Sequence, residues 1–460
     1  MLDDENKDFF KKLDKSHYRN EEFQHFQSLF NAIFQELEFM LNEMRFSNSK
    51  DNQVKYQKNM NILNEWYNFS QKNMQLKEST FGFPVNLVKR TFLVDFFRIM
   101  EAFDISLNNC GDIYDLYTDS LTSKSIEWDI VGLIAEHLGL PEQPKFSILT
   151  QNPKEYANGY WGYVTSGGSE SNAWGIRQGF LEYPTGMLYF CESAHYSIPK
   201  ASERFNHQVI MQNSFNDESI DVKFLLKCIR ENWKRAKIPA IVILTFGTTK
   251  YGSVDDITKI KKELKNMRIP HYLHIDAAFY GGIPRNQEKA PQIPPYDEWG
   301  YDSICVSVHK YIGYPVVKSV LISTRNPSGK FIDYIGQEDN TVAGSRDIPA
   351  FSLRQQIIEI LHYSEPKEYI RNIDFFIEII NELSIEFIQW SNGVSEGNIF
   401  VFEVNTNHPD YKNICERWEL CDFINKNHVQ SVHVVILPYH SHIALKSLAI
   451  DLSKIVKKLV

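Results

Sequence analysis

The sequence predicts an α/β protein, in which a parallel or mostly parallel sheet carries helices on both faces. Two observations predict this fold class. Short apolar runs alternate with helical stretches, and the gaps between the runs, such as residues 221–237, are long enough for crossover helices. The runs that we interpret as strands are MLYFC (187–191), AIVILTF (240–246), YLHI (272–275), SICVSV (303–308) and SVLIS (319–323).

A smaller α+β unit is predicted after residue 345. A helix is expected over residues 350–363, and further helix is expected to residue 390. Two apolar strands, NIFVFEV (398–404) and SVHVVIL (431–437), follow. Helices and strands that are segregated in this way are typical of an α+β unit.

Length and charge limit the classes of function. A chain of 460 residues is too long for one small module and favours two or three domains. The 58 acidic residues outnumber the 49 basic ones, which argues against nucleic-acid binding, because a protein that binds the phosphate backbone needs a basic face. A hydrophobic share of 43% is enough for a large core and excludes global disorder.

We expect the protein to be cytoplasmic and not to bind membranes. The longest mainly apolar stretch, residues 238–246, is about half as long as a membrane span. The start, MLDDENKDFFKKLDK, is charged where a signal peptide is apolar. The six cysteines lie far apart, except Cys415 and Cys421, and none forms a CxxC pair, so they indicate reduced thiols and not a disulfide framework.

The first 80 residues contain neither glycine nor proline, and they predict an amphipathic helix. Its apolar residues recur at the helical period: Phe23, Phe26, Leu29, Phe30, Ile33, Phe34, Leu37, Met40, Leu41 and Met44. We expect this helix to cover apolar surface on its own chain or on a sister subunit. The alternative, a helix on a membrane surface, lacks the basic polar face that it needs.

A glycine-rich turn follows one predicted strand. In GYVTSGGSESN (162–172) a strand ends near Val164 and Thr165, and a helix begins after the glycines. Glycines let a ligand approach the backbone, and a helix start offers free N–H groups to an anion. The turn matches neither GxGxxG nor GxxxxGK[ST], so it does not indicate a dinucleotide or a nucleoside triphosphate. Alone, it is equally consistent with a plain turn.

Three chemically capable side chains follow other predicted strands. His195 comes after MLYFC, Asp276 ends the strand YLHI, and Lys310 follows SICVSV close behind Ser307. Open α/β sheets bind ligands at the carboxyl ends of their strands. Taken singly, His195 is also consistent with a structural histidine, Asp276 with a helix cap or a metal ligand, and Lys310 with a surface lysine. A lysine at the end of a buried strand is nevertheless costly unless it is paired or covalently engaged.

The order of these four features changes the interpretation. A phosphate-binding turn, a histidine that stacks on a ring, a carboxylate for a ring nitrogen and a reactive lysine are what pyridoxal phosphate requires. The sequence resembles the group II pyridoxal-phosphate-dependent amino-acid decarboxylases, above all bacterial histidine decarboxylases and plant serine decarboxylases. The motifs that carry the resemblance are GYVTSGGSESN, YFCESAHYSIPKA, FGTTKYGSVDDI, YLHIDAAFYGG, VHKYIGYP and TVAGSRD.

The resemblance covers about residue 66 to the end and implies fold type I, with a mostly parallel seven-stranded sheet, helices on both faces and a small C-terminal α+β domain. It divides the chain into a helical extension (1–65), an N-terminal segment with the large cofactor domain (66–345) and the small domain (346–460). It further implies pyridoxal 5'-phosphate as cofactor and a homodimer whose active site lies at the interface.

The resemblance also assigns roles around the cofactor ring. Lys310 is expected to bind the cofactor covalently, and Asp276 to pair with the pyridine nitrogen and keep it protonated. His195 is expected to stack on the ring and Ala278 to pack on the opposite face. Thr248 is expected near the phenolic oxygen.

Other residues are expected at the phosphate and at the edge of the site. The residues assigned to the phosphate are Ser166, Gly167, Gly168, Ser169, Ser307 and His309. Ser345 is expected to reach the cofactor phosphate of the partner subunit. Tyr334 lies on a segment that forms a mobile lid in relatives, where a tyrosine can return a proton to the α-carbon; His195 and a bound water are the alternatives.

The reaction that the resemblance implies is decarboxylation of an L-amino acid to its amine and CO2. Histidine is the leading substrate, with serine, methionine and branched aliphatic amino acids as alternatives. The chain departs from the family at Val308, Tyr314 and Lys318, beside the reactive lysine, and we expect a bulky Tyr314 to reshape the substrate pocket.

Three other interpretations stay open at this point. The same scaffold is also consistent with an oxidative deaminase or a decarboxylation-dependent transaminase. A non-catalytic scaffold is disfavoured by the intact His195, Asp276 and Lys310. His433, His440 and His442 lie close together in sequence, but no cysteine or carboxylate pattern completes a metal site, and we expect none.

Overall fold

The computed structural model describes residues 79–83, 109–114, 123–140, 160–204, 209–212, 217–296, 300–325, 327, 330–346 and 350–457. Contacts divide the chain into two compact units, Met1–Thr80 with Ile443–Ser447 and Phe81–His442 with Leu448–Val460. The predicted N-terminal helix and the boundary expected near residue 65 lie outside the described residues. The boundary expected near residue 345 stays a prediction. No helix in the described part of the chain is long and apolar enough to cross a membrane.

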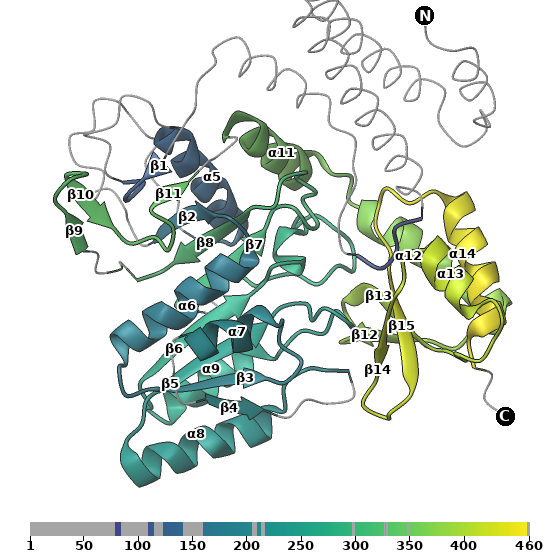
Figure 1. Ribbon diagram of the computed structural model, residues 1–460, viewed down its shortest axis with the longest axis horizontal. Coiled ribbons are helices and arrows are strands. Elements are labelled where there is room, and N and C mark those ends of the chain that lie inside the picture. The colour runs from purple at the N-terminus through teal and green to yellow at the C-terminus, as the bar shows by residue number, and fades with distance from the viewer. Residues whose placement is uncertain are drawn as a thin grey trace, which may run out of the picture. The chain divides into compact units, whose positions relative to one another are not determined.

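The second unit is built on a seven-stranded sheet with the strand order β2-β8-β7-β6-β5-β3-β4 (Figure 1). Its strands are β2 (Trp161–Thr165), β3 (Met187–Cys191), β4 (Val209–Gln212), β5 (Ala240–Thr245), β6 (His271–Asp276), β7 (Ser303–Ser307) and β8 (Ser319–Ser323). The strands from β4 to β7 pair in parallel, whereas β8 is antiparallel to both of its neighbours. The mostly parallel seven-stranded sheet expected from the sequence is confirmed.

All five apolar runs form strands within one residue of their predicted ends. Every residue of β3, β5, β7 and β8 is buried, as expected for strands that are covered on both faces. The edge strand β4 was not predicted, because its four residues are too short an apolar run to stand out. It lies at one end of the sheet, where it pairs only with β3.

Helices cover both faces of this sheet. On one face, α6 (Gly168–Glu182) and α7 (Ser197–Arg204) share an apolar cluster with β3, β5 and β6. On the other face lies α8 (Val222–Ala236), whose Asn232 donates a hydrogen bond to Tyr189 of β3 (2.8 Å). Tyr189 and its neighbour Leu188, which belongs to the first cluster, point to opposite faces because side chains alternate along a strand. Figure 1 shows α6 and α8 on either side of the strands.

Two glycines allow α6 to lie unusually close to the sheet. A Cβ atom at Gly175 would be 2.4 Å from Nδ1 of His274 on β6, and one at Gly179 would be 2.7 Å from Cγ2 of Ile241 on β5. No side chain fits at such distances without displacing its neighbour. The start of α6 is therefore fixed against the middle strands, at the edge of the sheet where the predicted site residues lie.

The C-terminal part contains a four-stranded antiparallel sheet of order β12-β13-β15-β14. The strands are β12 (Ile388–Ser391), β13 (Glu396–Glu403), β14 (Cys421–Ile424) and β15 (Gln430–Val435). The helices are α11 (Ala350–Tyr363), α12 (Glu368–Glu382), α13 (Tyr411–Arg417) and α14 (His442–Ile455). The predicted α+β composition is therefore observed here.

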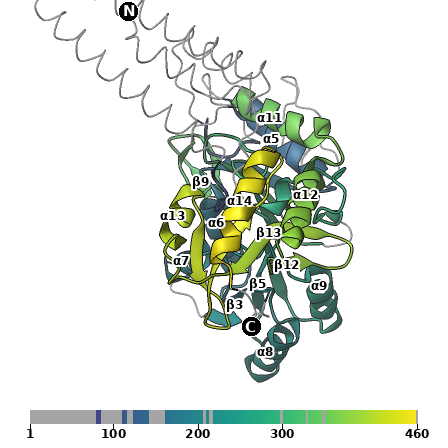
Figure 2. The ribbon, with the colours of Figure 1, turned by 90° about the vertical axis from the view of Figure 1, so that its right-hand side faces the viewer.

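One prediction for this region is wrong. The helix expected to reach residue 390 ends at Glu382, and the residues from Ile388 form a strand instead. β12 pairs with β13, and tertiary pairing of this kind overrides the local helical pattern. Phe376 of α12 packs edge-on against Phe400 of β13, with ring centroids 5.2 Å apart, so the helix covers this sheet (Figure 2).

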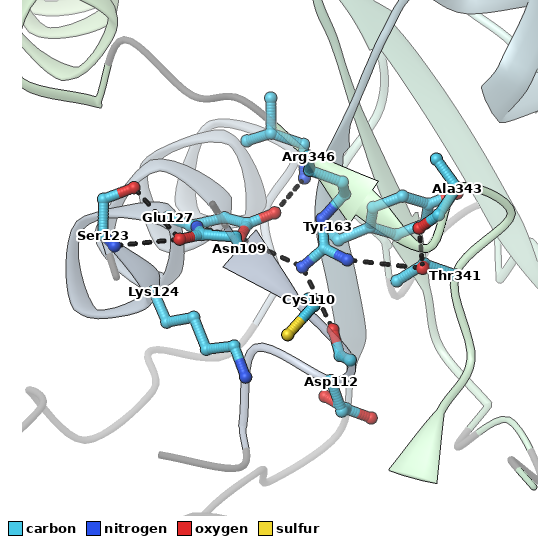
Figure 3. Close-up of polar contacts among 12 residues, drawn as sticks. Asn109, Cys110, Asp112, Ser123, Lys124, Glu127, Tyr163, Thr341, Ala343 and Arg346 are labelled. Carbon is cyan, nitrogen blue, oxygen red and sulfur yellow. Dashed lines mark hydrogen bonds and ion pairs between the residues drawn. The ribbon is translucent and has the colours of Figure 1, made fainter. Parts of the chain in front are cut away.

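A buried polar cluster joins three short elements at the β2 end of the large sheet (Figure 3). The two-residue strands β1 (Asn109–Cys110) and β11 (Ser345–Arg346) pair antiparallel beside α5 (Lys124–His137). Figure 3 shows the Arg346 guanidinium pointing at the carboxylate of Glu127 and at Thr341. These contacts hold the segment that carries Ser345.

The ion pair between Arg346 and Glu127 is the centre of this cluster. Nη2 of Arg346 lies 3.3 Å from Oε2 of Glu127, and the two side chains are 4% and 0% exposed. The Glu127 carboxylate also accepts hydrogen bonds from Asn109 Nδ2 (2.7 Å) and from the backbone N–H of Val164 (2.9 Å). A buried carboxylate with this number of donors is well compensated for its loss of hydration.

We expect Glu127→Gln to lower the free energy of unfolding by about 3–5 kcal/mol, because it leaves the Arg346 charge buried without a counter-ion. Chemical denaturation of the full chain measures the loss. The matched control is Asp129→Asn on the same helix, which breaks the half-exposed pair of Asp129 with Arg354 (3.2 Å). An exposed pair contributes about 0–1 kcal/mol. Equal losses in the two variants would contradict the role of burial.

Candidate active site

Three side chains with reactive groups meet at the carboxyl edge of the parallel strands. Asp276 ends β6, His195 lies in the turn that follows β3, and Lys310 lies in the turn that follows β7. Burial lowers the pKa of His195, and the same imidazole feels the charges of both Asp276, which opposes the shift, and Lys310, which adds to it. The structure therefore brings together the three residues that the sequence singled out separately.

The Asp276 carboxylate is buried, 5% exposed, and its oxygens are engaged by three donors. Oδ2 accepts from Asn172 Nδ2 (2.9 Å), and Oδ1 accepts from the backbone N–H of Ala278 (3.2 Å) and from Sγ of Cys305 (3.6 Å). Burial raises the pKa of the Cys305 thiol well above its ordinary value, and the charge of Asp276 adds to the effect, so Cys305 stays a protonated donor. All three contacts favour the charged carboxylate.

The imidazole of His195 is fixed by Ser197, the first residue of α7. Nδ1 lies 2.8 Å from Oγ of Ser197, and the Ser197 backbone N–H points at the same nitrogen from 3.3 Å. Because burial lowers the pKa of His195, the ring is neutral at neutral pH. A neutral imidazole has one proton-bearing nitrogen and one acceptor, so the partners of Nδ1 decide which is which.

The glycine-rich turn lies between β2 and α6. Gly167 has a φ of +152°, which disfavours any side chain there, and α6 begins at Gly168. A Cβ atom at Gly168 would be 3.0 Å from Oγ of Ser307 and 3.7 Å from Cβ of Ala278. The first turn of α6 therefore faces the ends of β6 and β7 with its backbone, and its free N–H groups and helix dipole favour an anion at this place.

The hydroxyl groups of this turn have different partners. Ser166 donates to Oε2 of Glu170 from both its backbone N–H (2.9 Å) and its hydroxyl (2.6 Å). Oε1 of Glu170 accepts from the hydroxyl of Tyr163 (2.9 Å). Ser169 is exposed at the start of the helix. Ser166 and Ser169 thus lie at the expected place, and the Ser166 hydroxyl serves the turn itself.

Ser307, at the end of β7, is different, because its buried hydroxyl has no hydrogen-bond partner among the residues that the structure describes. Its neighbour His309 lies 2.9 Å, at Nδ1, from the carbonyl oxygen of Lys318 and therefore donates from that nitrogen. Burial lowers the pKa of His309. Thr248, buried after β5, accepts from the backbone N–H of Ser253 (3.0 Å).

Two residues expected at the site lie on peripheral elements of this chain. Tyr334 is in the turn between β9 (Lys330–Ile332) and β10 (Gln337–Asp339), and 90% of its side chain is exposed. A side chain exposed to this degree makes almost no contact with its own chain. Ser345 is exposed on β11, one residue before the buried Arg346. Their expected roles, at a lid and at a partner subunit, stay predictions.

Tyr314, expected to reshape the substrate pocket, is buried and 2% exposed. Its hydroxyl lies 2.8 Å from Oγ of Ser352 on α11, so the ring ties the turn after Lys310 to that helix. The three C-terminal histidines also have structural contacts. Nε2 of His433 lies 2.9 Å from the carbonyl oxygen of Gly82, Nδ1 of His440 accepts from the Leu437 N–H (3.1 Å), and His442 stacks on Phe375. No cluster of metal-binding side chains occurs in the described ranges.

Sequence reasoning missed four residues that contact the site: Asn172, Ser197, His274 and Cys305. His274 shares a face of β6 with Asp276 two residues later, as strand alternation requires, and it lies 3.0 Å, at Nε2, from Oδ1 of Asn172. Asn172 ends the motif GYVTSGGSESN and lies on the first turns of α6. The alternation of side chains along a strand could have identified His274, because it lies two residues before Asp276. No pattern in the neighbouring sequence identifies Asn172, Ser197 or Cys305 as contacts of the site.

Comparison with known proteins agrees with this geometry. Residues 183–353 match the pyridoxal-dependent decarboxylase conserved domain. Over 259 residues the chain is 31% identical to a histidine decarboxylase of Acinetobacter baumannii, a match that covers 55% of this chain and 62% of that protein. It is 32% identical over 272 residues to serine decarboxylase 3 of Oryza sativa, covering 58% and 55%. The chain spans less than two thirds of the length of these curated relatives.

The fold is shared with solved structures. L-methionine decarboxylase from Streptomyces sp. 590 superimposes with a TM-score of 0.66, covering 88% of this chain and 95% of that chain at 16% sequence identity. The decarboxylase domain of a Vibrio parahaemolyticus protein, described as a diaminobutyrate-pyruvate transaminase and L-2,4-diaminobutyrate decarboxylase, gives a TM-score of 0.61 at 14% identity. At these identities the likeness shows the fold, which is the expected fold type I.

The domain match implies pyridoxal 5'-phosphate as the cofactor, and the residues present fit it. The start of α6 offers N–H groups to a phosphate, and Gly168 leaves room beside the Ser307 hydroxyl, which has no partner within the described part of the chain. Asp276 is a buried carboxylate suited to a protonated ring nitrogen, and Lys310 supplies an amine. Residues 183–353 thus form a pyridoxal-dependent decarboxylase domain.

Proposed function

We propose that this protein decarboxylates an L-amino acid, releasing the amine and CO2, with pyridoxal 5'-phosphate as cofactor and histidine as the leading substrate. The observation that carries the proposal is the meeting of His195, Asp276 and Lys310 at the end of the parallel strands. The domain match and the resemblance to histidine and serine decarboxylases support the reaction.

In this proposal the chain's own groups hold the cofactor at five points. Lys310 would bind it covalently through the side-chain amine, and Asp276 would pair with the ring nitrogen. The N–H groups of Gly168 and Ser169 at the start of α6, together with the hydroxyl of Ser307, would hold the phosphate. When bound, the cofactor supplies an electron sink for the electrons that the departing carboxylate leaves behind.

Asp276 has the role of keeping the cofactor ring able to accept electrons. A carboxylate that is buried and held by three donors stays charged, and a charged carboxylate keeps the facing ring nitrogen protonated. His195 and Ala278 confine the ring from its two faces in this proposal. Asp276 itself is buried, which strengthens its electrostatic interaction with the ring nitrogen.

The α-carbon must regain a proton after CO2 leaves, and we propose the protonated form of His195 as the donor in this chain, because the ring then returns to its neutral form. It lies within the electrostatic reach of Lys310 and Asp276, whereas Tyr334 is 90% exposed. A donor must lie within hydrogen-bond reach of the atom that it protonates. Tyr334 takes this role only if its hairpin closes over a site, in its own or a partner subunit.

We further propose a cytoplasmic homodimer. The six cysteines are all free thiols, which suits a reducing compartment. The exposed Ser345 is held rigidly by its pairing with Cys110 and by the buried Arg346 beside it, so it is placed to reach a partner's phosphate. A fully active monomer would contradict this part of the proposal.

Lys310→Ala is expected to abolish CO2 release and to remove the visible absorbance band of the lysine-bound cofactor. Only a primary amine at this place bonds to the aldehyde of the cofactor. Absorbance spectra and CO2 assays on the same preparations measure both effects. The control, Lys265→Ala at an exposed position of α9 (Ile257–Asn266), keeps the band and the activity. A native protein without such a band would favour a non-catalytic scaffold.

We expect Ser307→Ala to weaken cofactor binding by about tenfold to a hundredfold without lowering the stability of the cofactor-free chain. The buried hydroxyl has no partner in the described residues until a phosphate arrives, and a hydrogen bond to a charged group contributes about 1.5–3 kcal/mol.

The matched control for Ser307→Ala is Ser319→Ala. The two serines pair across β7 and β8, but Ser319 Oγ donates to the carbonyl oxygen of Val306 (2.9 Å). Its loss is expected to destabilise the chain by about 1 kcal/mol and to leave cofactor affinity unchanged. Fluorescence titration with pyridoxal 5'-phosphate and chemical denaturation separate the two effects. Unchanged cofactor affinity in Ser307→Ala, together with weaker affinity in Ser319→Ala, would contradict the assignment of Ser307 to the phosphate site.

A panel of L-amino acids decides the substrate and the reaction. We expect histidine to give histamine and CO2 in equal amounts, with slower or no turnover of serine, methionine and branched aliphatic amino acids. Mass spectrometry identifies the product, and CO2, amine and aldehyde are assayed together. Aldehyde in place of amine would replace the simple decarboxylase with an oxidative deaminase on the same scaffold.

A further inference from the structure

A chain of buried hydrogen bonds connects the site to the middle of the sheet, and Asn172 is its branching point. Asn172 is 1% exposed and its side chain bonds to four other side chains, one of them Cys305, whose Sγ lies 3.4 Å from Oδ1. Its Nδ2 lies 2.9 Å from Oδ2 of Asp276 and 3.0 Å from Oγ of Ser197, and its Oδ1 lies 3.0 Å from Nε2 of His274. The amide of Asn172 thus contacts Asp276 directly and reaches His195 through Ser197.

The amide orientation of Asn172 follows from its neighbours. A charged carboxylate only accepts hydrogen bonds, so the NH2 group of Asn172 must face Asp276. The amide oxygen then faces His274, which must donate from Nε2. Burial lowers the pKa of His274 to about 4, so this ring is neutral, and its unprotonated Nδ1 accepts from the hydroxyl of Ser303 (2.7 Å). Ser303 in turn accepts from the hydroxyl of Tyr272 (2.9 Å).

The space for His274 is part of this arrangement. Gly175 lies one helical turn after Asn172, and a Cβ atom there would be 2.4–2.7 Å from three atoms of the His274 ring. Register places His274 opposite Ser303 on the parallel strand β7. The polar chain is therefore built into the closest contact between α6 and the sheet.

The other branch determines which nitrogen of His195 carries the proton. Asn172 gives its second N–H to Oγ of Ser197, so the Ser197 hydroxyl is free to donate, and Nδ1 of His195 lies 2.8 Å from it. The Ser197 backbone N–H converges on the same nitrogen from 3.3 Å. Two donors at Nδ1 require that it be the unprotonated nitrogen.

We propose that Asn172 is a positioning residue that sets the tautomer of His195, with the proton on Nε2, and at the same time orients the Asp276 carboxylate. This inference deepens the proposed function, because it defines the neutral resting form of His195, in which Nε2–H is the hydrogen-bond donor that the ring offers to a substrate. The direction of every bond follows from groups that have only one possible role, the Asp276 carboxylate at the centre and the Ser197 backbone N–H at the end.

The test is Asn172→Asp, which keeps the shape of the side chain but presents an oxygen to Ser197. The Ser197 hydroxyl then donates to the introduced carboxylate, its oxygen accepts from His195, and the ring proton moves to Nδ1. Solid-state NMR of the full-length protein, labelled with 15N histidine and loaded with pyridoxal 5'-phosphate, detects which nitrogen is protonated. The His195 signal is assigned by its loss in His195→Gln.

We also expect Asn172→Asp to weaken binding of pyridoxal 5'-phosphate about tenfold, because Asp276 loses a donor and gains a like charge. Asn232→Asp is the matched control: it buries a carboxylate on the opposite face of the same sheet, where Asn232 is 9% exposed and bonds to Tyr189. This control is expected to keep the Nε2 proton and to change affinity by less than about twofold.

Two results overturn the proposal: a ring proton on Nδ1 of His195 in the native protein, or an unchanged Nε2 proton in folded Asn172→Asp. If that variant does not fold, Ser197→Ala decides alongside the native protein. It removes the hydroxyl through which Asn172 acts on Nδ1 and leaves only the backbone N–H at 3.3 Å, so the ring proton is expected to divide between Nδ1 and Nε2, and an Nε2 proton as complete as in the native protein contradicts the role of Asn172. The tautomer is also measured without cofactor, so a chain that releases no CO2 from any amino acid contradicts the proposed function but leaves this inference intact.

Discussion

The buried carboxylate of Asp276 is the constraint on which the rest of the site depends. A charge at 5% exposure is costly unless donors surround it, and here the donors come from three separate elements: Asn172 on α6, the N–H of Ala278 in the turn after β6, and Cys305 on β7. Asn172 reaches the carboxylate only because α6 lies close against the sheet, and that distance depends on the missing side chain at Gly175. One electrostatic requirement therefore fixes the helix position, and the helix position brings the start of α6 to the ends of β6 and β7.

The local pattern of apolar residues was sufficient to predict the central strands of the large sheet and the site residues that follow them. Buried parallel strands are continuous apolar runs, so the strands that end near Asp276 and Lys310 were placed to within a residue. Because such strands run in one direction, the residues that follow them meet at one edge, and His195 joined them there without any signal of its own. Short strands whose hydrogen bonds come from distant partners were not predictable. β4 pairs at the sheet edge, and the residues of β12, whose local pattern favours the end of a helix, form a strand because they pair with β13.

The polar chain behind the site was equally beyond prediction, for a related reason. Asn172, His274 and Ser303 come from α6, β6 and β7, and only the register of β6 against β7 and the approach of α6 bring them together. Asn172 and His274 lie within sequence motifs, but no motif encodes their contact with each other or the contact of His274 with Ser303. Tyr314 shows the same limit from the other side: its bulk beside the reactive lysine suggested a pocket wall, whereas its hydroxyl is engaged by Ser352 on α11, a helix that begins much later in the chain. The size of a side chain is known from the sequence, but the direction in which that side chain points is not.

The contrast between Ser307 and its neighbours explains how a site so fully hydrogen-bonded still selects a ligand. Asp276, Asn172, His274 and Ser303 satisfy one another, so they are rigid and have little left to offer. Ser307 is buried at the same edge with no partner among the described residues, and an unsatisfied buried hydroxyl costs the chain about 1–3 kcal/mol. An anion that arrives beside the N–H groups of α6 recovers this cost, whereas an apolar group does not. The preference for an anion at this place comes from those N–H groups and the helix dipole, and the Ser307 hydroxyl, which has no partner among the described residues, adds one more donor to them.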